Sequence, residues 1–248
     1  MVISELPVGS VVRLGRYTLG HRPDELIDID WIKVSKSNEF IAQKVLLGMP
    51  FDAREGWNAN YSYRLSNIRQ FMNSEQQNWY NPTHPNDSAP GYVTFDSYMV
   101  SNLNRYCGLL YHFSDEEINL LNPMDGDRIR LPKLSEIMAQ FPYFKRYGKR
   151  AHAVRTYGEL DRNDYREGTY HRYYILGDEE NKLCEMGRDG NYRAISPTRY
   201  SGVRPVCKIN ANAEVIETGN NIYKMNLSSS EPVKFFKETQ SIDWLLGI

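Results

Sequence analysis

Cysteine is scarce in this chain, which carries three thiols in 248 residues, at Cys107, Cys184 and Cys207. A secreted module built on disulfides normally has an even and denser set, so the odd count favours synthesis in a reducing cytosol. No run of about 18 consecutive apolar residues occurs, as a membrane-spanning helix would need. Residues 1–10 lack the basic start and apolar stretch of a secretory signal. We therefore predict neither a signal peptide nor a membrane span.

Excess charge is missing as well, because 30 Lys and Arg residues balance 31 Asp and Glu residues. Nucleic-acid binding needs a concentrated positive surface, which a net charge of −1 does not provide globally. One basic run spans 145–152, yet acidic residues follow from Glu159 onward. A solvated loop is the simpler interpretation of that run, and a contact with phosphate or an acidic partner is the alternative. We predict no nucleic-acid partner.

Motifs for metal or hydrolytic chemistry are also absent from the sequence. The five histidines are dispersed, and no two have helical or hairpin ligand spacing. The acidic segments 125–127 and 161–164 do not continue into a calcium-binding loop of the EF-hand type. No G-x-S-x-G turn marks a serine nucleophile. The sequence thus predicts no metal, no cofactor and no catalytic residue.

The apolar pattern predicts a mixed α+β protein. Short apolar runs at 11–14, 27–34 and 40–47 indicate strands in an antiparallel meander, the first of them ending in a turn at Gly15. Later strands are expected near 170–176 and 202–209, with a hairpin at 215–225. The segment 78–92 is rich in proline and asparagine and is expected to be irregular.

Three short helices are predicted between these strands. The first has Leu65, Ile68, Phe71 and Met72 on one face. The second begins at Ser114, which forms the spacing of a capping box with Glu117. The third begins at Pro132, and its apolar face would comprise Leu134, Ile137, Met138 and Phe141.

The chain ends in a polar break followed by a partly apolar tail. We predict a domain over 1–225 and a linker with a docking tail over 226–248. The tail residues expected to make the contact are Phe235, Phe236, Trp244, Leu245 and Leu246. Docking on a neighbouring subunit and docking on the chain's own core both stay open.

Tyrosine and arginine are concentrated in the C-terminal half. Residues 143–200 hold nine of the 18 tyrosines together with nine arginines. These residue types are enriched at recognition hot spots, although strand alternation would leave half of the side chains at 169–175 in the core. The predicted ligand or partner residues are Arg155, Tyr165, Tyr170, His171, Arg172, Tyr173, Tyr174, Tyr192, Arg193, Arg199 and Tyr200.

An ordered set of short motifs resembles an uncharacterised family of bacterial and phage domains. The motifs are Leu14-Gly15-Arg16-Tyr17, Trp31-Ile32-Lys33-Val34, Ser66-Asn67-Ile68-Arg69 with Met72 and Asn73, Leu131 with Ser135 and Glu136, Arg155, and Gly202-Val203-Arg204-Pro205. This family is related to the sulfatase-modifying-factor branch of the C-type-lectin-like fold. The resemblance covers residues 5 to 225 and implies short antiparallel sheets, two or three short helices and long irregular loops.

The resemblance also separates structural residues from candidate ligand residues. Trp31 would be a buried strand residue, and Arg69 and Arg204 would anchor loop carbonyls through their guanidinium donors. The sequence departs from the family at Ala153-Val154, before Arg155, and the stretch 148–199 has no evident counterpart. That stretch is where domains of this fold usually place their ligand loops.

Three functions are expected from these features. The first is a non-catalytic recognition or structural module of a phage or prophage particle, in its tail, fibre or capsid, binding a host-surface glycan or a protein partner. Self-assembly and assembly with another subunit both stay open, and the protein would lie in the virion or, before assembly, in the host cytoplasm. The second is an intracellular phage protein that inhibits a host factor. The third is an enzyme derived from the sulfatase-modifying scaffold, which would need Cys184 and Cys207 as a reactive pair, although Cys207 is expected to be an inert strand thiol.

Overall fold

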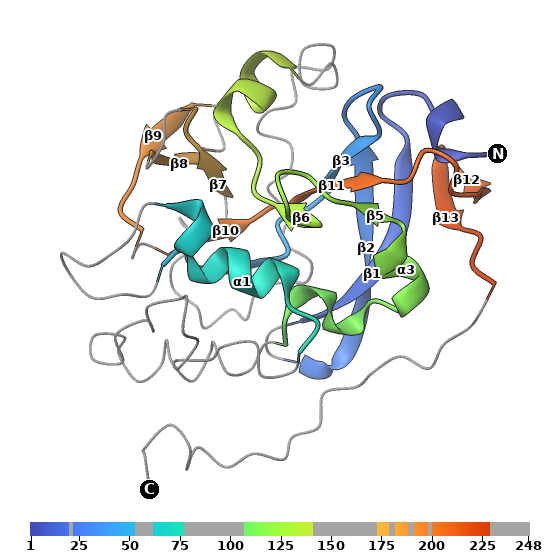
Figure 1. The fold of residues 1–248 in the computed structure, drawn as a ribbon, viewed down its shortest axis with the longest axis horizontal. Helices are drawn as coiled ribbons and strands as arrows, with labels where there is room; N and C mark the ends of the chain where they lie inside the picture. Colours follow the sequence, from blue (N-terminus) through green and yellow to red (C-terminus); the bar gives the residue numbers. More distant parts are fainter. Residues whose placement is uncertain are drawn as a thin grey trace, which may run out of the picture.

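The computed structural model describes residues 1–19, 22–52, 62–76, 107–140, 173–178, 182–187, 191–197 and 200–228. These residues form a mixed α+β structure, mostly strands in an eight-stranded and a five-stranded sheet with few helices. Figure 1 shows the larger sheet on the right and the smaller sheet on the left. The predicted α+β class is confirmed at this level.

The larger sheet starts with the predicted antiparallel meander. It comprises β1 (Val11–Leu19), β2 (Arg22–Lys33) and β3 (Glu39–Ala42). Alternation along β1 buries Val12 while Arg13 stays exposed. One face of the meander therefore packs on the core, and the opposite face carries the exposed side chain of Arg13.

Gly15 does not end the first strand, contrary to the sequence prediction. Its φ of +73° places it in the left-handed region, and the pairing of β1 with β2 shifts register between Arg13 and Arg16. The strand passes through this bulge and continues to Leu19. A side chain at Gly15 would collide with the ring of Phe113, so glycine is required here for space as well as for conformation.

The strand predicted over 202–209 is in fact two strands in different sheets. β10 (Tyr200–Val203) belongs to the smaller sheet, whereas β11 (Val206–Ile209) pairs with β3 in the larger one. Proline has no N–H for a sheet hydrogen bond, and Pro205 lies at the break. β11 also pairs with β5 (Leu121–Asn122) and β6 (Ile129–Arg130).

The predicted C-terminal hairpin is confirmed. β12 (Val215–Gly219) and β13 (Ile222–Met225) pair antiparallel around Asn220 and Asn221, whose φ angles are 54° and 61°. Two positive φ values suit a tight hairpin turn, and asparagine tolerates them better than most residues. β13 then pairs in parallel with β1, so the last strand of the larger sheet in the sequence lies beside the first.

The smaller sheet has the order β4-β10-β7-β8-β9. Its remaining strands are β4 (Leu47–Pro50), β7 (Tyr173–Leu176), β8 (Leu183–Met186) and β9 (Tyr192–Ala194). β10 and β7 run parallel, and the other neighbours are antiparallel.

The helices are short, as predicted. Ser66 caps α1 (Asn67–Asn73) by accepting from the amide of Arg69, and Ser114 forms the predicted capping box with Glu117 at the start of α3 (Asp115–Asn119). The third predicted helix is a single π turn, and Phe141 lies outside the described residues. The helical elements are η1 (Ile3–Glu5), η3 (Tyr63–Leu65), α1 (Asn67–Asn73), η4 (Leu109–His112), α3 (Asp115–Asn119) and η5 (Glu136–Gln140).

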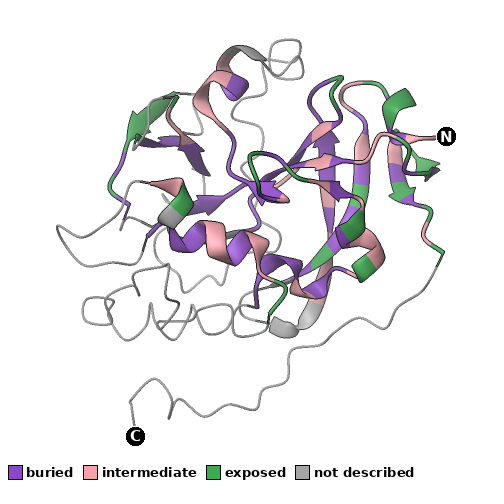
Figure 2. Cartoon of the chain, viewed as in Figure 1, coloured by how far each residue is buried: buried purple, intermediate pink, exposed green. Residues whose placement is uncertain are grey.

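Two clusters of buried side chains join the sheets. Figure 2 marks the buried residues of both sheets in purple. One cluster contains Trp31, Phe71 and Tyr174, and so combines the larger sheet, α1 and one side of the smaller sheet. The other contains Ile41 and Tyr173, from the opposite sides of the same two sheets. The described parts of both sheets therefore share their cores.

Contacts of the chain continue just past the predicted domain end at residue 225. The amide of Asn226 donates to the Glu214 carbonyl at 2.9 Å, and Leu227 packs against the first cluster. Ser228 donates from its amide and its hydroxyl to Glu116 at 3.0 Å. Residues 229–248, with all five predicted tail residues, lie outside the described part, and their role stays a prediction.

Candidate functional site on the five-stranded sheet

The smaller sheet carries every predicted ligand residue that falls in the described part of the chain. Tyr173 and Tyr174 lie on β7, Tyr192 and Arg193 on β9, and Tyr200 begins β10. The remaining predicted ligand residues lie outside the described residues; these are Arg155, Tyr165, Tyr170, His171, Arg172 and Arg199.

The two tyrosines of β7 are core residues, which corrects their assignment to a ligand face. Tyr173 and Tyr174 each have 0% of their surface exposed. β7 lies between β10 and β8, and both of its faces are covered by the buried clusters, so alternation does not turn either ring outward. Neither ring offers a surface to a partner.

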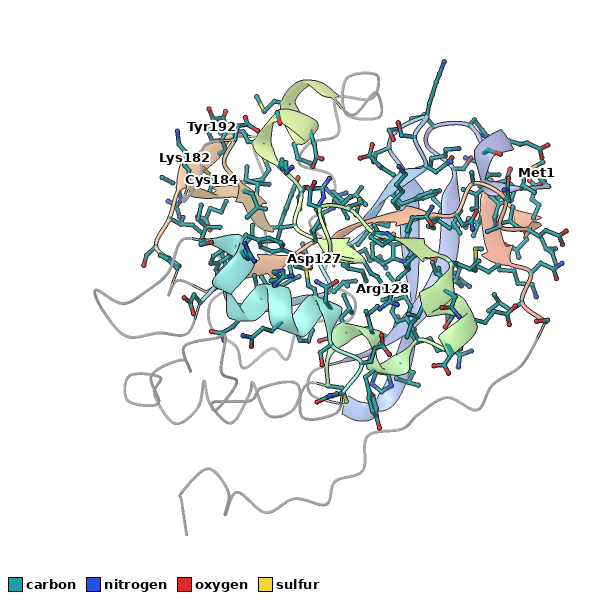
Figure 3. The ribbon with its side chains drawn as sticks, in the orientation of Figure 1. Met1, Asp127, Arg128, Lys182, Cys184 and Tyr192 are labelled. Atoms are coloured by element: carbon teal, nitrogen blue, oxygen red, sulfur yellow. The ribbon has the colours of Figure 1, made fainter. Side chains whose placement is uncertain are left out.

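The strand β9, in contrast, is exposed along its whole length. Tyr192 is 46% exposed, and Figure 3 shows this residue at the outer rim of the smaller sheet. Among the described strands β9 pairs with β8 alone, so it forms the border of the described sheet. Of the predicted ligand residues whose side chains are described, Tyr192 and Arg193 are therefore the two that reach the surface.

Tyr192 and Arg193 point to opposite sides of this border strand. In the register of β9 with β8, Arg193 lies opposite Glu185 and Tyr192 lies opposite Met186. Because successive side chains of a strand alternate between the two faces, the arginine and the tyrosine cannot form one flat patch. They share an edge instead of a face.

A buried carboxylate holds Arg193 in place. Nε of Arg193 donates to Oε1 of Glu185 at 2.6 Å, and the Ser201 hydroxyl donates to Oε2 at 3.3 Å. The Glu185 side chain is 1% exposed, whereas that of Arg193 is 48% exposed. A buried carboxylate without a partner would be costly, so this pairing fixes the guanidinium against the sheet.

Sequence reasoning missed Glu185 and Ser201. A signal was present, because Glu185 stands within the otherwise apolar strand Leu183–Met186. A charged residue in such a run has to find a partner when the strand is buried. The pairing itself could not be predicted, since it depends on the register of β8 with β9.

Arg204 lies at the junction of the two sheets. Its Nε donates to the Ala42 carbonyl of β3 at 2.9 Å, and its guanidinium lies 5.1 Å from the ring centre of Tyr173. Burial raises the pKa of the Tyr173 hydroxyl, against the opposing effect of Arg204. Arg204 is 1% exposed, and the structure places it as a buried link between β3 and β7.

The other two residues assigned structural roles also make buried or half-buried contacts. Nε1 of Trp31 donates to the Leu14 carbonyl at 2.8 Å, and the ring is 0% exposed. Arg69 forms a two-pronged pair with Asp127, with Nε to Oδ2 at 2.9 Å and Nη2 to Oδ1 at 2.8 Å. These contacts fix β1 to β2 and α1 to the turn before β6.

Cys184 and Cys207, the pair that a cysteine mechanism would need, lie in different sheets. Cys184 lies on β8 in the second cluster, whereas Cys207 lies on β11 in the first. Both thiols are buried, and burial raises the pKa of each. Burial also raises the pKa of Cys107 to about 12.

Two further buried charges have structural partners. Nζ of Lys33 donates to the carbonyls of Ile3 at 2.7 Å and Leu6 at 2.9 Å, which holds η1 on the sheet. Arg130 forms a buried ion pair with Glu136, which also accepts from the amide of Lys133 at 2.7 Å. Within the described ranges, no group of three or more His, Cys, Asp and Glu side chains is gathered as a metal site would require.

Comparisons with known proteins returned no relative. No family model, no curated protein sequence and no solved structure matches the chain. In the described part, no helix has the length and apolar character needed to cross a membrane.

Proposed function

We propose that this protein is a non-catalytic recognition or structural module of a phage or prophage particle. Its core would be a C-type-lectin-like scaffold, and its exposed Tyr and Arg residues would bind a protein partner or a host-surface glycan. The partner would be a neighbouring virion subunit or a host protein, and assembly with copies of itself is a further form of the same role.

The observation that carries this proposal is the exposed border strand β9. Tyr192 is 46% exposed there, beside an arginine fixed by a buried carboxylate. Exposed tyrosine and arginine are the residue types that most often dominate recognition energetics. A fixed side chain also loses less conformational entropy on binding than a mobile one.

The sheet arrangement supports the scaffold part of the proposal. The two sheets share their buried clusters and are joined around Arg204 in the Gly-Val-Arg-Pro motif. Recognition modules commonly place their binding residues on the edges and loops of such a rigid core. The particle context comes from the motif resemblance alone.

The second candidate is an intracellular phage protein that inhibits a host factor. The same exposed pair on β9 favours it, because a host protein is as suitable a partner as a virion subunit. An enzyme derived from the sulfatase-modifying scaffold is less favoured, since Cys184 and Cys207 are buried in different sheets.

Mass spectrometry of purified particles tests the proposal. We expect the chain at a fixed copy number per particle, and host-surface glycans or virion subunits would then be assayed as partners. Where no particle is known, the tagged chain is purified from its host. Absence from particles together with capture of one host protein would overturn the structural role and favour the inhibitor.

A further inference from the structure

We infer that the outer edge of β9 binds an extended acidic peptide of a protein partner, which adds a strand to the five-stranded sheet. This inference rests on the proposed recognition function and specifies the chemistry of its partner. Three observations carry it: the orientation of the backbone of β9, the exposure of β9, and the paired state of Arg193.

The first observation is the direction of the backbone groups. The amide of Ile195 donates to the Leu183 carbonyl at 3.1 Å, and the Gly187 amide donates to the Asn191 carbonyl at 2.7 Å. Backbone groups of an antiparallel strand alternate between its two sides. The backbone N–H and C=O groups of residues 191, 193 and 195 thus point toward β8. Those of Tyr192 and Ala194 point toward the outer edge.

The second observation is that this edge is exposed. All three residues of β9 are exposed, and β9 pairs with β8 alone among the described strands (Figure 2). An exposed edge is a template for a further strand unless the protein blocks it. Neither proline nor lysine, which commonly block edges, occurs in Tyr192–Ala194.

The third observation concerns the charge on this strand. A charged side chain protects an edge because an added strand would have to bury it without a partner. Arg193 is already paired through Nε with Glu185, and within the described part Glu185 is its one partner. Among the described residues no acceptor contacts its two terminal nitrogens, so an acidic side chain opposite Arg193 would complete its pairing.

These features select one kind of strand. An apolar side chain opposite Arg193 would cover its terminal nitrogens without offering an acceptor, and a basic side chain would add a like charge. Directly opposed side chains on neighbouring strands lie about 4.5 to 5.5 Å apart between Cβ atoms, which is close enough for a carboxylate to reach the guanidinium. The expected ligand therefore alternates acidic and apolar residues.

The test uses two defined probes, an acetylated nonapeptide alternating Val and Glu and its counterpart alternating Val and Lys. Each is titrated into the ¹⁵N-labelled full chain and followed by NMR. We expect the Glu peptide to shift the amides of Tyr192 and Ala194 and to protect them from hydrogen exchange. Its affinity should exceed that of the Lys peptide by about tenfold or more.

Two variants separate the charge contact from folding. Arg193→Gln removes the guanidinium that pairs with the buried Glu185, which should destabilise the sheet. The double variant Glu185→Gln with Arg193→Gln removes both charges, and its unchanged amide spectrum elsewhere would show that the sheet is intact. The folded double variant should bind the Glu and Lys peptides equally.

The inference is overturned if neither Tyr192 nor Ala194 responds to the Glu peptide at millimolar concentration, or if both peptides bind equally to the unmodified chain. This outcome is independent of the particle test. Presence in particles without peptide binding would reject the acidic strand and keep the proposed function, whereas absence from particles would reject the function whatever the peptide does.

Discussion

Nε of Arg204 donates a 2.9 Å hydrogen bond to the carbonyl oxygen of Ala42, which lies 162 residues earlier in the sequence. The bond connects β3 of the larger sheet to the break between β10 and β11. The same guanidinium lies over the ring of Tyr173 in the smaller sheet. One buried side chain thus connects both sheets, and its loss should affect the whole described fold.

Arg204→Ala should lower the free energy of unfolding by about 2 to 4 kcal/mol, because it leaves the Ala42 carbonyl unpaired and a cavity beside Tyr173. Urea unfolding followed by far-UV circular dichroism measures the change. The control is Arg16→Ala, whose side chain is 46% exposed and pairs with Asp28 at 3.3 Å, and which should cost at most about 1 kcal/mol. Equal losses in the two variants would contradict the linking role.

Tyr173→Ala should destabilise the protein by about 3 to 5 kcal/mol, since it empties a fully buried aromatic position. Tyr192→Ala, in the same sheet but 46% exposed, should cost less than about 1 kcal/mol. Thermal unfolding of both variants compares them directly. A stable Tyr173→Ala protein that loses partner binding would restore the assignment of Tyr173 to a ligand face.

Gly15→Ala should cost about 2 to 4 kcal/mol, because the new methyl group meets the Phe113 ring in addition to the strain of a φ of +73°. Gly126→Ala is a matched control, since its φ of +92° is also positive and nothing lies within 4 Å of the added Cβ. It should cost about 1 kcal/mol from conformation alone. If the two variants lose the same stability, the Phe113 contact is not what requires glycine at residue 15.

Native-state alkylation should spare all three thiols. A thiol pKa raised to about 12, as at Cys107, lowers the thiolate fraction at pH 8 by roughly three orders of magnitude relative to a free cysteine. Labelling should speed up as the pH rises toward that value and should become complete in denaturant. Iodoacetamide labelling with mass spectrometry measures each site, and rapid labelling of Cys184 or Cys207 at pH 8 would reopen the cysteine mechanism.

Local signals in the sequence predicted local structure well. The Ser114 and Glu117 capping box and the hairpin over 215–225 depend on residues a few positions apart, and both occur as expected. The meander of β1, β2 and β3 also follows from its apolar alternation.

Features that depend on distant residues escaped prediction. Glycine is required at residue 15 because a side chain there would collide with Phe113, which is almost a hundred positions away in the sequence. Tyr173 and Tyr174 are both buried because a cluster of side chains covers each face of β7. No pattern within 170–176 indicates that both faces are covered. Pro205 could have indicated the break between β10 and β11, but not that the two strands enter different sheets.

Site-specific photo-crosslinking tests the central claim, that β9 is the recognition edge, most directly. A benzophenone amino acid replaces Tyr192 in one protein and Ile216 on β12 in the other, and both positions are 46% exposed in the native chain. After irradiation in the host or the assembled particle, we predict one dominant protein adduct at position 192, through an acidic segment of the partner, and none at position 216. Absence of an adduct at 192, or the same adducts at both positions, would contradict the account.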